Sequence, residues 1–331
     1  MPLAWSRRAV GGVAVFAALG FLTATGTAQA EWRGWNIHVP EYSVSQGMDW
    51  FTDELAARTD GRLTARTFHS GVLGSQPDAI EQLRLGGIDF AVFNLGPMGP
   101  VVPETNVVSL PFVFRDLEHS HRAMDGALGE ALAEAMAREG LKALAWYDSG
   151  SRSFYNSQRP INTPADLRGM KVRVMNNDLF VGMIEALGGN ATPMAFSEVY
   201  QSLRTGVVDG AENNFPSFQS TGHFEVAGYY SISEHLIIPE CLCMNLRRWN
   251  SLSAEDQALV LELAQASAVM QRELWAESDA AAMEAVIAAG VRINEVEDKA
   301  AFQAAMSPVY EMAFQRNPEL EPLVELIQSI E

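Results

Sequence analysis

Two arginines and one asparagine have the residue types and the spacing to bind a small anion. Arg173 lies in residues 171–175 (KVRVM), where valines alternate with basic residues as they do in a short strand. Arg152 lies in an earlier strand-like run, and Asn213 ends a later one. A guanidinium held on a strand can bind a carboxylate through two parallel N–H···O bonds. A strand arginine paired with a neighbouring Asp or Glu would give the same pattern, so the residues alone leave both interpretations open.

The strongly acidic composition limits the classes of partner. The chain carries a formal charge of −18, with 41 acidic residues against 23 Lys and Arg. Such a balance argues against nucleic acid and against anionic membrane surfaces as partners. It also means that a site for an anion must be locally cationic, which makes the two arginines more informative than they would be in a basic protein.

The first 30 residues have the pattern of a cleavable signal peptide. Arg7 and Arg8 form a basic segment, residues 9–22 form an apolar core, and residues 28–30 (AQA) give the small-x-small motif of a cleavage site. The apolar core is shorter than the ~20 residues that a membrane anchor needs. We therefore predict a protein of the periplasm that begins at Glu31 and does not insert into the membrane. The adjacent arginines leave a twin-arginine export route as an alternative.

No motif of a known catalytic chemistry stands out. The sequence has no glycine-rich phosphate loop, no G-x-S-x-G nucleophile motif and no H-E-x-x-H zinc motif. Cys241 and Cys243 share one face if they lie in a strand, near the upper distance limit for a disulfide, and we expect buried thiols. His119 and His121 do not share a helical face, and we expect them at the surface. No catalytic residue, cofactor or metal site is therefore predicted.

The elements that position these residues alternate between strands and helices, which is typical of α/β folds. Residues 118–139 are predicted to form one helix, and the small polar residues 148–151 are predicted to mark a crossing into a second lobe. Residues 226–246 contain two strand-like runs that return the chain to the first lobe. Residues 253–289 are predicted to form one helix that is long enough to span both lobes.

The predicted fold class is therefore α/β, with two lobes, mixed β-sheets flanked by helices, and a ligand cleft between the lobes. We assign residues 31–150 and about 239–278 to lobe I, and residues 151–238 and about 279–331 to lobe II. A chain of about 300 residues exceeds what one hydrophobic core usually serves, which also favours two lobes.

Three segments resemble the signature motifs of one protein family. They are residues 110–116 (LPFVFRD), residues 165–173 (ADLRGMKVR) and residues 192–213, which begin with TPMAFSEVY and end with GVVDGAEN. Taken together and in this order, they are similar to the periplasmic solute-binding proteins of TRAP transporters (the DctP type), over essentially the whole mature chain. The resemblance implies a two-lobed periplasmic-binding-protein fold, a small carboxylate ligand, and a TRAP permease in the membrane as partner.

The resemblance also implies roles for individual residues of the second lobe. Arg173 matches the arginine that binds the substrate carboxylate bidentately, and Arg152 matches a second arginine that many members have. Asn213 matches a residue that hydrogen-bonds the same carboxylate, and Phe196 matches an aromatic residue that packs on the ligand body. Asn176 lies where members contact the ligand with a polar side chain.

Other positions bear on which substrate is chosen. Gln76 and Asn94 match first-lobe positions that choose between substrates, although a loop Gln and a strand-end Asn are also common as solvated or capping residues. Met175 stands where members that bind flat ringed osmolytes often carry an aromatic residue. Three further residues are expected to reach ligand hydroxyls near the cleft mouth: His38, Glu41 and Glu240.

The identity of the ligand is the finest of these predictions. Neutral amides in the first lobe suit a ligand rich in hydroxyls, and residues 151–156 and 209–217 look most like the subset that binds sugar acids such as glucuronate and galacturonate. We predict a uronic acid, held by its carboxylate and enclosed as the lobes close. C4-dicarboxylates and 2-oxo acids are the alternative ligands. The alternatives from other classes are a periplasmic enzyme acting on sugar acids and a binding protein that serves a sensor or another permease.

Overall fold

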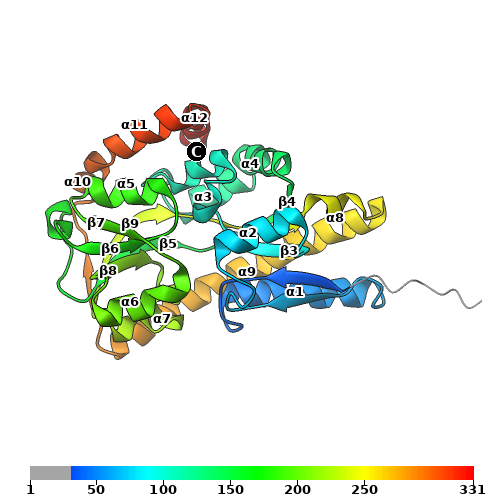
Figure 1. Cartoon of the computed structure of the whole chain (residues 1–331), viewed down its shortest axis with the longest axis horizontal. Helices are drawn as coiled ribbons and strands as arrows, with labels where there is room; N and C mark the ends of the chain where they lie inside the picture. Colours follow the sequence, from blue (N-terminus) through cyan, green and yellow to red (C-terminus); the bar gives the residue numbers. More distant parts are fainter. Residues whose placement is uncertain (1–30) are drawn as a thin grey trace, which may run out of the picture.

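Two β-sheets form the framework of the computed structural model, which describes residues 31–331 (Figure 1). The predicted signal peptide, residues 1–30, lies outside the described residues. The first sheet contains, in spatial order, β2 (Ala65–Phe68), β1 (Trp32–Trp35), β3 (Phe90–Asn94), β10 (Glu240–Asn245) and β4 (Leu141–Tyr147). The second contains β11 (Arg292–Glu295), β9 (Tyr229–Ile237), β5 (Ser151–Asn156), β8 (Gly210–Asn213), β6 (Lys171–Val174) and β7 (Asn190–Pro193).

Both sheets are mixed, and the chain changes sheet three times among its strands. In the first sheet, β1 pairs in parallel with β2 and β3, whereas β10 runs antiparallel to both β3 and β4. In the second, β6 pairs in parallel with β7 and β8, and β5 runs antiparallel to β8 and β9. The chain passes to the second sheet between β4 and β5, returns between β9 and β10, and passes to the second sheet again between β10 and β11. The ends of β3, β5, β6, β8 and β10 consequently meet between the two sheets.

Helices flank both sheets, so the predicted two-lobed α/β class is confirmed. Three of them carry or border site residues: α2 (Gln76–Leu85), α5 (Asp178–Ala186) and α7 (Phe215–Ser220). The others are α1 (Ser43–Arg58), α3 (Leu117–Met124), α4 (Ala127–Arg138), α6 (Val199–Thr205), α8 (Leu246–Asn250), α9 (Ala254–Ala288), α10 (Lys299–Ala305), α11 (Ser307–Arg316) and α12 (Leu320–Ser329).

The long helix α9 crosses from one half of the molecule to the other, as predicted (Figure 1). It begins with the Ser253 side chain accepting from the backbone N–H of Asp256, and it packs first on α1 and β4 and later on α7. At the first crossing between the sheets, the buried Gln271 side chain donates to Asp148 O (3.0 Å) and accepts from Asp148 N (2.8 Å). The helix is therefore hydrogen-bonded to the chain where it changes sheet.

The predicted helix over residues 118–139 is wrong, because the chain forms two helices there. Between α3 and α4, Gly126 adopts an extended, non-helical conformation (φ −119°, ψ −144°). The start of α4 then lies directly against the end of α3, since a Cβ on Gly129 would be 1.8 Å from Met124 O. Two glycines thus allow a sharp break inside a pattern that reads as continuous helix.

The predicted surface position of His119 is also wrong, because this side chain is buried. Its Nδ1 accepts from Arg115 N (3.1 Å), and its Nε2 lies 3.0 Å from Ile327 O in α12. The expected buried thiols are confirmed, since Cys241 and Cys243 are free and buried. His119 therefore attaches the last helix to the start of α3.

The C-terminal helices contact both halves of the molecule. α11 packs on α5 beside the second sheet, whereas α12 packs on α4 and on the 3-10 segment Pro103–Ser109. The predicted lobe boundaries place both helices in lobe II, but the contacts of α12 are with elements of lobe I. The remaining residue limits of the lobes stay a prediction.

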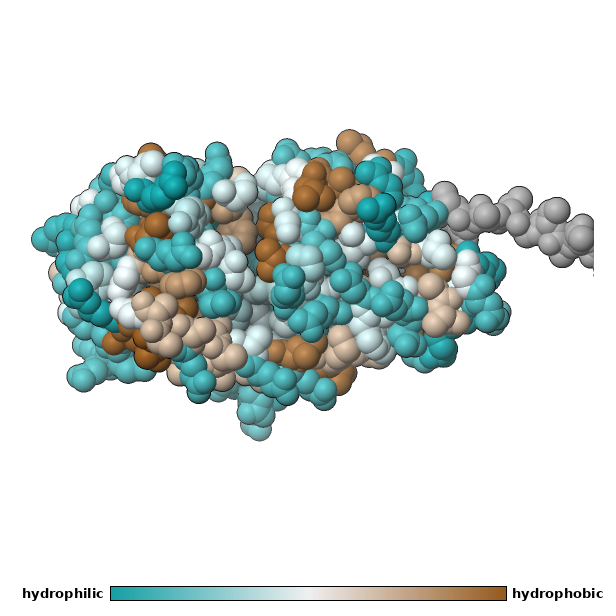
Figure 2. All heavy atoms as spheres, turned by 90° about the horizontal axis from the view of Figure 1, so that it is seen from below, coloured by the Kyte–Doolittle hydropathy of each residue, from teal (hydrophilic) through white to brown (hydrophobic). Residues whose placement is uncertain are grey.

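The surface of the described residues is mixed in character. Figure 2 shows the face formed by α1, α6 and α7, where polar side chains surround separate apolar patches. Among residues 31–331, none of the helices combines the length and the apolar character that crossing a bilayer requires.

Asp279 on α9 gives a pH-dependent stability that can be measured. Burial, and secondly the charge of Glu234, raises its pKa from 3.8 to about 6. The folded state therefore holds this proton more tightly than the unfolded state, so its stabilising contribution is full below pH 3.8 and is lost as the pH rises through 6. We expect Asp279→Asn to raise the free energy of unfolding at pH 8 by about 1–3 kcal/mol.

The gain should shrink toward zero as the pH falls to 4 and below, and urea unfolding across this range measures it. Glu277→Gln, an exposed residue of the same helix, is the matched control and should show no such gain. An equal gain for Asp279→Asn at pH 4 and pH 8 would contradict the explanation by ionisation.

Candidate functional site

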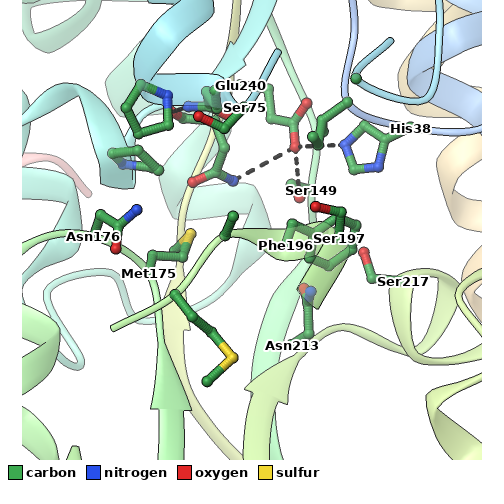
Figure 3. Close-up of a pocket in the computed structure, with 18 of the residues that line it drawn as sticks. His38, Ser75, Ser149, Met175, Asn176, Phe196, Ser197, Asn213, Ser217 and Glu240 are labelled. Atoms are coloured by element: carbon green, nitrogen blue, oxygen red, sulfur yellow. Dashed lines mark hydrogen bonds and ion pairs between the residues drawn. The ribbon is translucent and has the colours of Figure 1, made fainter. Parts of the chain in front are cut away.

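One cavity lies between the two sheets, and all of the predicted site residues except Glu41 line it (Figure 3). The second-lobe wall comes from β5, from β6 and the residues after it, from the 3-10 segment Phe196–Glu198, and from the end of β8. The first-lobe wall comes from the segment after β1, the start of α2, the end of β3 and the start of β10. The predicted residues that line the cavity are His38, Gln76, Asn94, Arg152, Arg173, Met175, Asn176, Phe196, Asn213 and Glu240.

Arg173 is a buried cation without an acidic partner. Its side chain is 4% exposed, and no ion pair joins it to an Asp or Glu among the described residues. Nε and Nη2 donate to Met194 O at 3.2 and 2.9 Å, and the guanidinium carbon lies 5.9 Å from the centre of the Phe196 ring. Burial, with a contribution from the charge of Arg152, lowers the pKa of Arg173 to about 10. The group is still charged at neutral pH, and its Nη1 has no hydrogen-bond partner within residues 31–331.

Arg152 lines the same cavity but is already neutralised. Its Nε and Nη2 bind the two carboxylate oxygens of Glu212 at 2.6 and 2.8 Å, and Nη2 also donates to Glu212 O at 2.8 Å. Both side chains are buried. Of the two interpretations left open for a strand arginine, pairing with an acidic neighbour is the one that the structure shows for Arg152, and its predicted contact with the ligand stays a prediction.

The carboxylate of Glu212 is held in its charged form. Burial acts to raise its pKa, but the charge of Arg152, the nearby His235 ring (Nε2 lies 3.7 Å from Glu212 Oε2) and the hydrogen bonds from Arg152 outweigh that effect and lower the pKa to about 2. The His235 ring stacks on Phe154 with centroids 4.1 Å apart. Glu212 and Arg152 thus form a fixed ion pair that underlies the second-lobe wall.

This ion pair also orients Asn213. The side-chain oxygen of Asn213 accepts from Arg152 Nη1 (2.7 Å) and from Asn214 N (2.9 Å). Its acceptor is therefore occupied, which turns the amide N–H₂ group toward the cavity as a donor. Asn213 and Arg173 both offer N–H groups on the same wall.

The first-lobe wall is organised around Glu240, which is 1% exposed. Its Oε1 accepts hydrogen bonds from His38 Nε2 (3.1 Å), Ser149 Oγ (3.2 Å) and Asn94 Nδ2 (3.5 Å) (Figure 3). Gln76 Nε2 donates to Asn94 O at 2.7 Å. Hydrogen bonds thus connect the four predicted first-lobe residues, which are His38, Gln76, Asn94 and Glu240. The amides of Gln76 and Asn94 both help to hold this wall in place.

The remaining predicted residues lie at different depths. Met175 is buried against Gly96, where a Cβ would lie 2.8 Å from the Met175 methyl group. Asn176 is exposed at the rim, and Phe196 stands edge-on to His38 with centroids 6.3 Å apart. Glu41 does not line this cavity: β1 ends at Trp35, and Glu41 lies exposed in a turn beside a separate groove, so its contact with the ligand stays a prediction.

Several cavity residues were not predicted from the sequence. Ser149 and Ser217 line the cavity, and Tyr42 reaches across behind it to Ser217 Oγ (3.0 Å) and Asn214 Oδ1 (3.3 Å). Asn214 Nδ2 donates to Ser149 O at 2.8 Å. Their positions in the sequence could have indicated two of these residues: Ser149 lies in the predicted crossing between the lobes, and Asn214 directly follows Asn213.

A cavity enclosed by two α/β lobes, with a buried cation on one wall and hydrogen-bonding groups on the other, defines a solute-binding protein of the periplasmic type. The chain belongs to the bacterial extracellular solute-binding protein family 7 (DctP), whose model matches residues 36–317. The family predicted from the sequence motifs is thereby confirmed.

Similar proteins cover nearly the whole chain. A solute-binding protein of Chromohalobacter salexigens is 55% identical over 303 residues, which are 91% of this chain and 90% of that protein. A TRAP periplasmic solute-binding protein of Roseobacter denitrificans, solved with bound β-D-glucuronate, is 62% identical, has a TM-score of 0.90 and covers 91% of this chain and 100% of that one. Another from Sulfitobacter sp. NAS-14.1, with bound β-D-galacturonate, is 60% identical, with a TM-score of 0.89 and coverages of 90% and 99%.

The Arg152–Glu212 pair predicts how the second lobe responds to losing one partner. Glu212→Gln leaves a buried guanidinium without its counter-charge, and we expect the free energy of unfolding at pH 7 to fall by about 3–5 kcal/mol. The folded-state pKa of Glu212 is depressed from 4.5 to about 2, so its stabilising contribution is present above pH 4.5 and is lost as the pH falls toward 2.

The difference between wild type and Glu212→Gln should accordingly narrow between pH 5 and pH 2 in urea unfolding experiments. Glu185→Gln, an exposed residue of α5, is the control and should change stability little. A difference that stays constant over this pH range would show that the charge of Glu212 is not what stabilises the lobe.

Proposed function

We propose that this protein is the receptor of a TRAP transporter and that it binds a uronic acid such as D-glucuronate or D-galacturonate. The observation that carries this proposal is the buried guanidinium of Arg173, which has no acidic partner among the described residues and faces the cavity. Burying an unpaired charge is unfavourable, and an organic anion in the cavity supplies the missing counter-charge.

The ligand carboxylate is placed on the second-lobe wall. Arg173 Nη1 and the remaining N–H of Nη2 present two donors, which suit a bidentate carboxylate. The amide N–H₂ of Asn213 adds a donor beside them, because its oxygen is occupied by Arg152. Arg152 retains one N–H on Nη1 beyond its bonds to Glu212 and Asn213, so its part is a single hydrogen bond rather than the main charge.

The sugar ring and hydroxyls are placed against the rest of the cavity. Phe196 offers an apolar ring face to the ligand body, and Glu240 Oε1 offers an acceptor to a hydroxyl on the opposite wall. His38, Ser149 and Asn176 are further polar groups in reach. The two similar proteins solved with glucuronate and galacturonate, at 62% and 60% identity, support a uronic acid over other carboxylates.

Binding between two lobes gives a simple mechanism of capture. A uronate that is held by Arg173 on one lobe and by Glu240 on the other stabilises the closed arrangement through contacts that an open cleft does not provide. We infer that the closed form is the one recognised by the membrane subunits of the TRAP permease. The proposed setting is the periplasm, reached through cleavage of the predicted signal peptide in residues 1–30.

Removing the guanidinium tests the carboxylate site. Arg173→Ala should weaken binding of D-glucuronate roughly 30- to 5,000-fold, because it removes one partner of a buried charged pair. Arg173→Lys should recover only part of this loss, since an ammonium cannot form the bidentate contact. Isothermal titration calorimetry measures all three proteins, and near wild-type affinity in Arg173→Ala would disprove the role of Arg173.

The matched control is Arg168→Ala, which removes an exposed arginine a few residues earlier in the same lobe. Its affinity for D-glucuronate should equal that of the wild type. A similar loss in both variants would indicate an effect of overall charge rather than of the cavity.

A receptor and an enzyme for sugar acids differ in what happens to the ligand. We expect D-glucuronate and D-galacturonate to be recovered unchanged after long incubation with the protein, because the family consists of solute-binding proteins and the related crystals contain intact uronates. Chromatography or NMR of the filtrate checks this. Formation of a new product in proportion to protein concentration would favour the enzyme.

A further inference from the structure

One cation on the second-lobe wall of the cavity has no ion-pair partner among the described residues. Of the residues that line it in the described part of the chain, three are of the Arg, Lys, Asp or Glu types: Arg152, Arg173 and Glu240. The charge of Arg152 is balanced by Glu212, which binds it through both carboxylate oxygens. Arg173 therefore provides a single positive charge on the second-lobe wall, enough for one carboxylate.

The first-lobe wall presents a carboxylate instead of a second cation. Glu240 is 1% exposed, and its Oε1 faces the cavity together with His38, Asn94 and Ser149 (Figure 3). Its Oε2 has no hydrogen-bond partner among the described residues. A ligand group that reaches this wall meets a carboxylate that is itself buried, and like charges repel more strongly in such surroundings than in water.

We infer that Glu240 makes this receptor selective for acids with a single carboxylate and excludes acids that carry a second carboxylate at the far end of the chain. The excluded class contains aldaric acids and C4-dicarboxylates. A hydroxyl at the far end donates a hydrogen bond to Glu240 Oε1, whereas a carboxylate there has no proton to donate and carries a like charge. The inference rests on the proposed function, because a carboxylate bound at Arg173 decides which end of the ligand faces Glu240.

D-Gluconate and D-glucarate form a matched pair of probes. Both are open six-carbon acids with the same hydroxyl groups between the ends, and they differ at one end, which is CH₂OH in gluconate and a carboxylate in glucarate. Calorimetry at pH 8, where an ordinary imidazole such as that of a histidine is neutral, compares them alongside D-glucuronate. We expect wild-type protein to bind D-gluconate at least about 100-fold more tightly than D-glucarate.

Glu240→Gln removes the charge and nearly keeps the shape. This variant should bind D-glucarate at least about tenfold more tightly than the wild type does. The matched control is Glu41→Gln, the same change at an exposed residue of the first lobe that lies outside the cavity. It should leave the affinity for D-glucarate unchanged, and thermal melting establishes that both variants are folded.

Each result decides the inference. Wild-type protein that binds D-glucarate as tightly as D-gluconate overturns it, whether or not Glu240→Gln folds. If the wild type binds D-glucuronate but neither open-chain acid, a gain of D-glucarate binding in Glu240→Gln supports the inference, and no gain overturns it. A result that contradicts the proposed function can be distinguished from these, because the wild type would then bind neither D-glucuronate nor D-galacturonate.

Discussion

The arrangement of this cavity depends on the buried guanidinium of Arg173, which has no acidic partner among the described residues. Moving a charged group out of water is very unfavourable unless other charges or dipoles replace the water. Around Arg173 the protein supplies only part of that replacement: the carbonyl oxygen of Met194, which accepts two of its N–H groups, and the ring of Phe196 at 5.9 Å. The pKa of Arg173 is lowered to about 10, which indicates that these groups replace only part of the water lost on burial. The site is thus built to be completed by an anion.

The contrast with Arg152 shows how the same residue type serves a different purpose two strands away in the same sheet. β5 lies next to β8, and their register sets Phe154 opposite Glu212 and Ser153 opposite Asn213. That neighbourhood gives Arg152 a carboxylate partner and gives Asn213 an occupied oxygen. The ion pair fixes the direction of the Asn213 amide. Among the described residues that line the cavity, it leaves Arg173 as the arginine without an acidic partner.

Much of the fold could be predicted from local patterns, because alternation of apolar residues reports secondary structure directly. The helix over residues 253–289 was predicted almost to its ends, Ala254 and Ala288, since its N-cap Ser253 and first-turn acids are local signals. The break between α3 and α4 was not predictable in this way. It depends on how closely Gly129 approaches Met124 O, which is a fact of packing rather than of pattern.

The site shows the same division between local and spatial information. Arg173 could be selected because its strand pattern and family motif are both local. The partner of Arg152 could not be predicted from the sequence, because Glu212 becomes its neighbour only when β5 and β8 pair in the sheet. Glu41 lies outside the cavity for a related reason: β1 ends at Trp35, and the path of the turn that follows it could not be read from the local pattern.

The position of Ser149 joins ligand binding to movement of the lobes. Ser149 lies in the first crossing between the sheets, next to Asp148, whose backbone is bound by Gln271 of α9. Its Oγ donates to Glu240 Oε1 on the first-lobe wall, and its carbonyl accepts from Asn214 at the end of the second-lobe strand β8. A change of angle between the lobes must therefore alter the groups that meet the ligand. In the proposed binding mode, a ligand that contacts Glu240 and Asn213 would also restrain this crossing, so closure would follow from the same hydrogen bonds that recognise the solute.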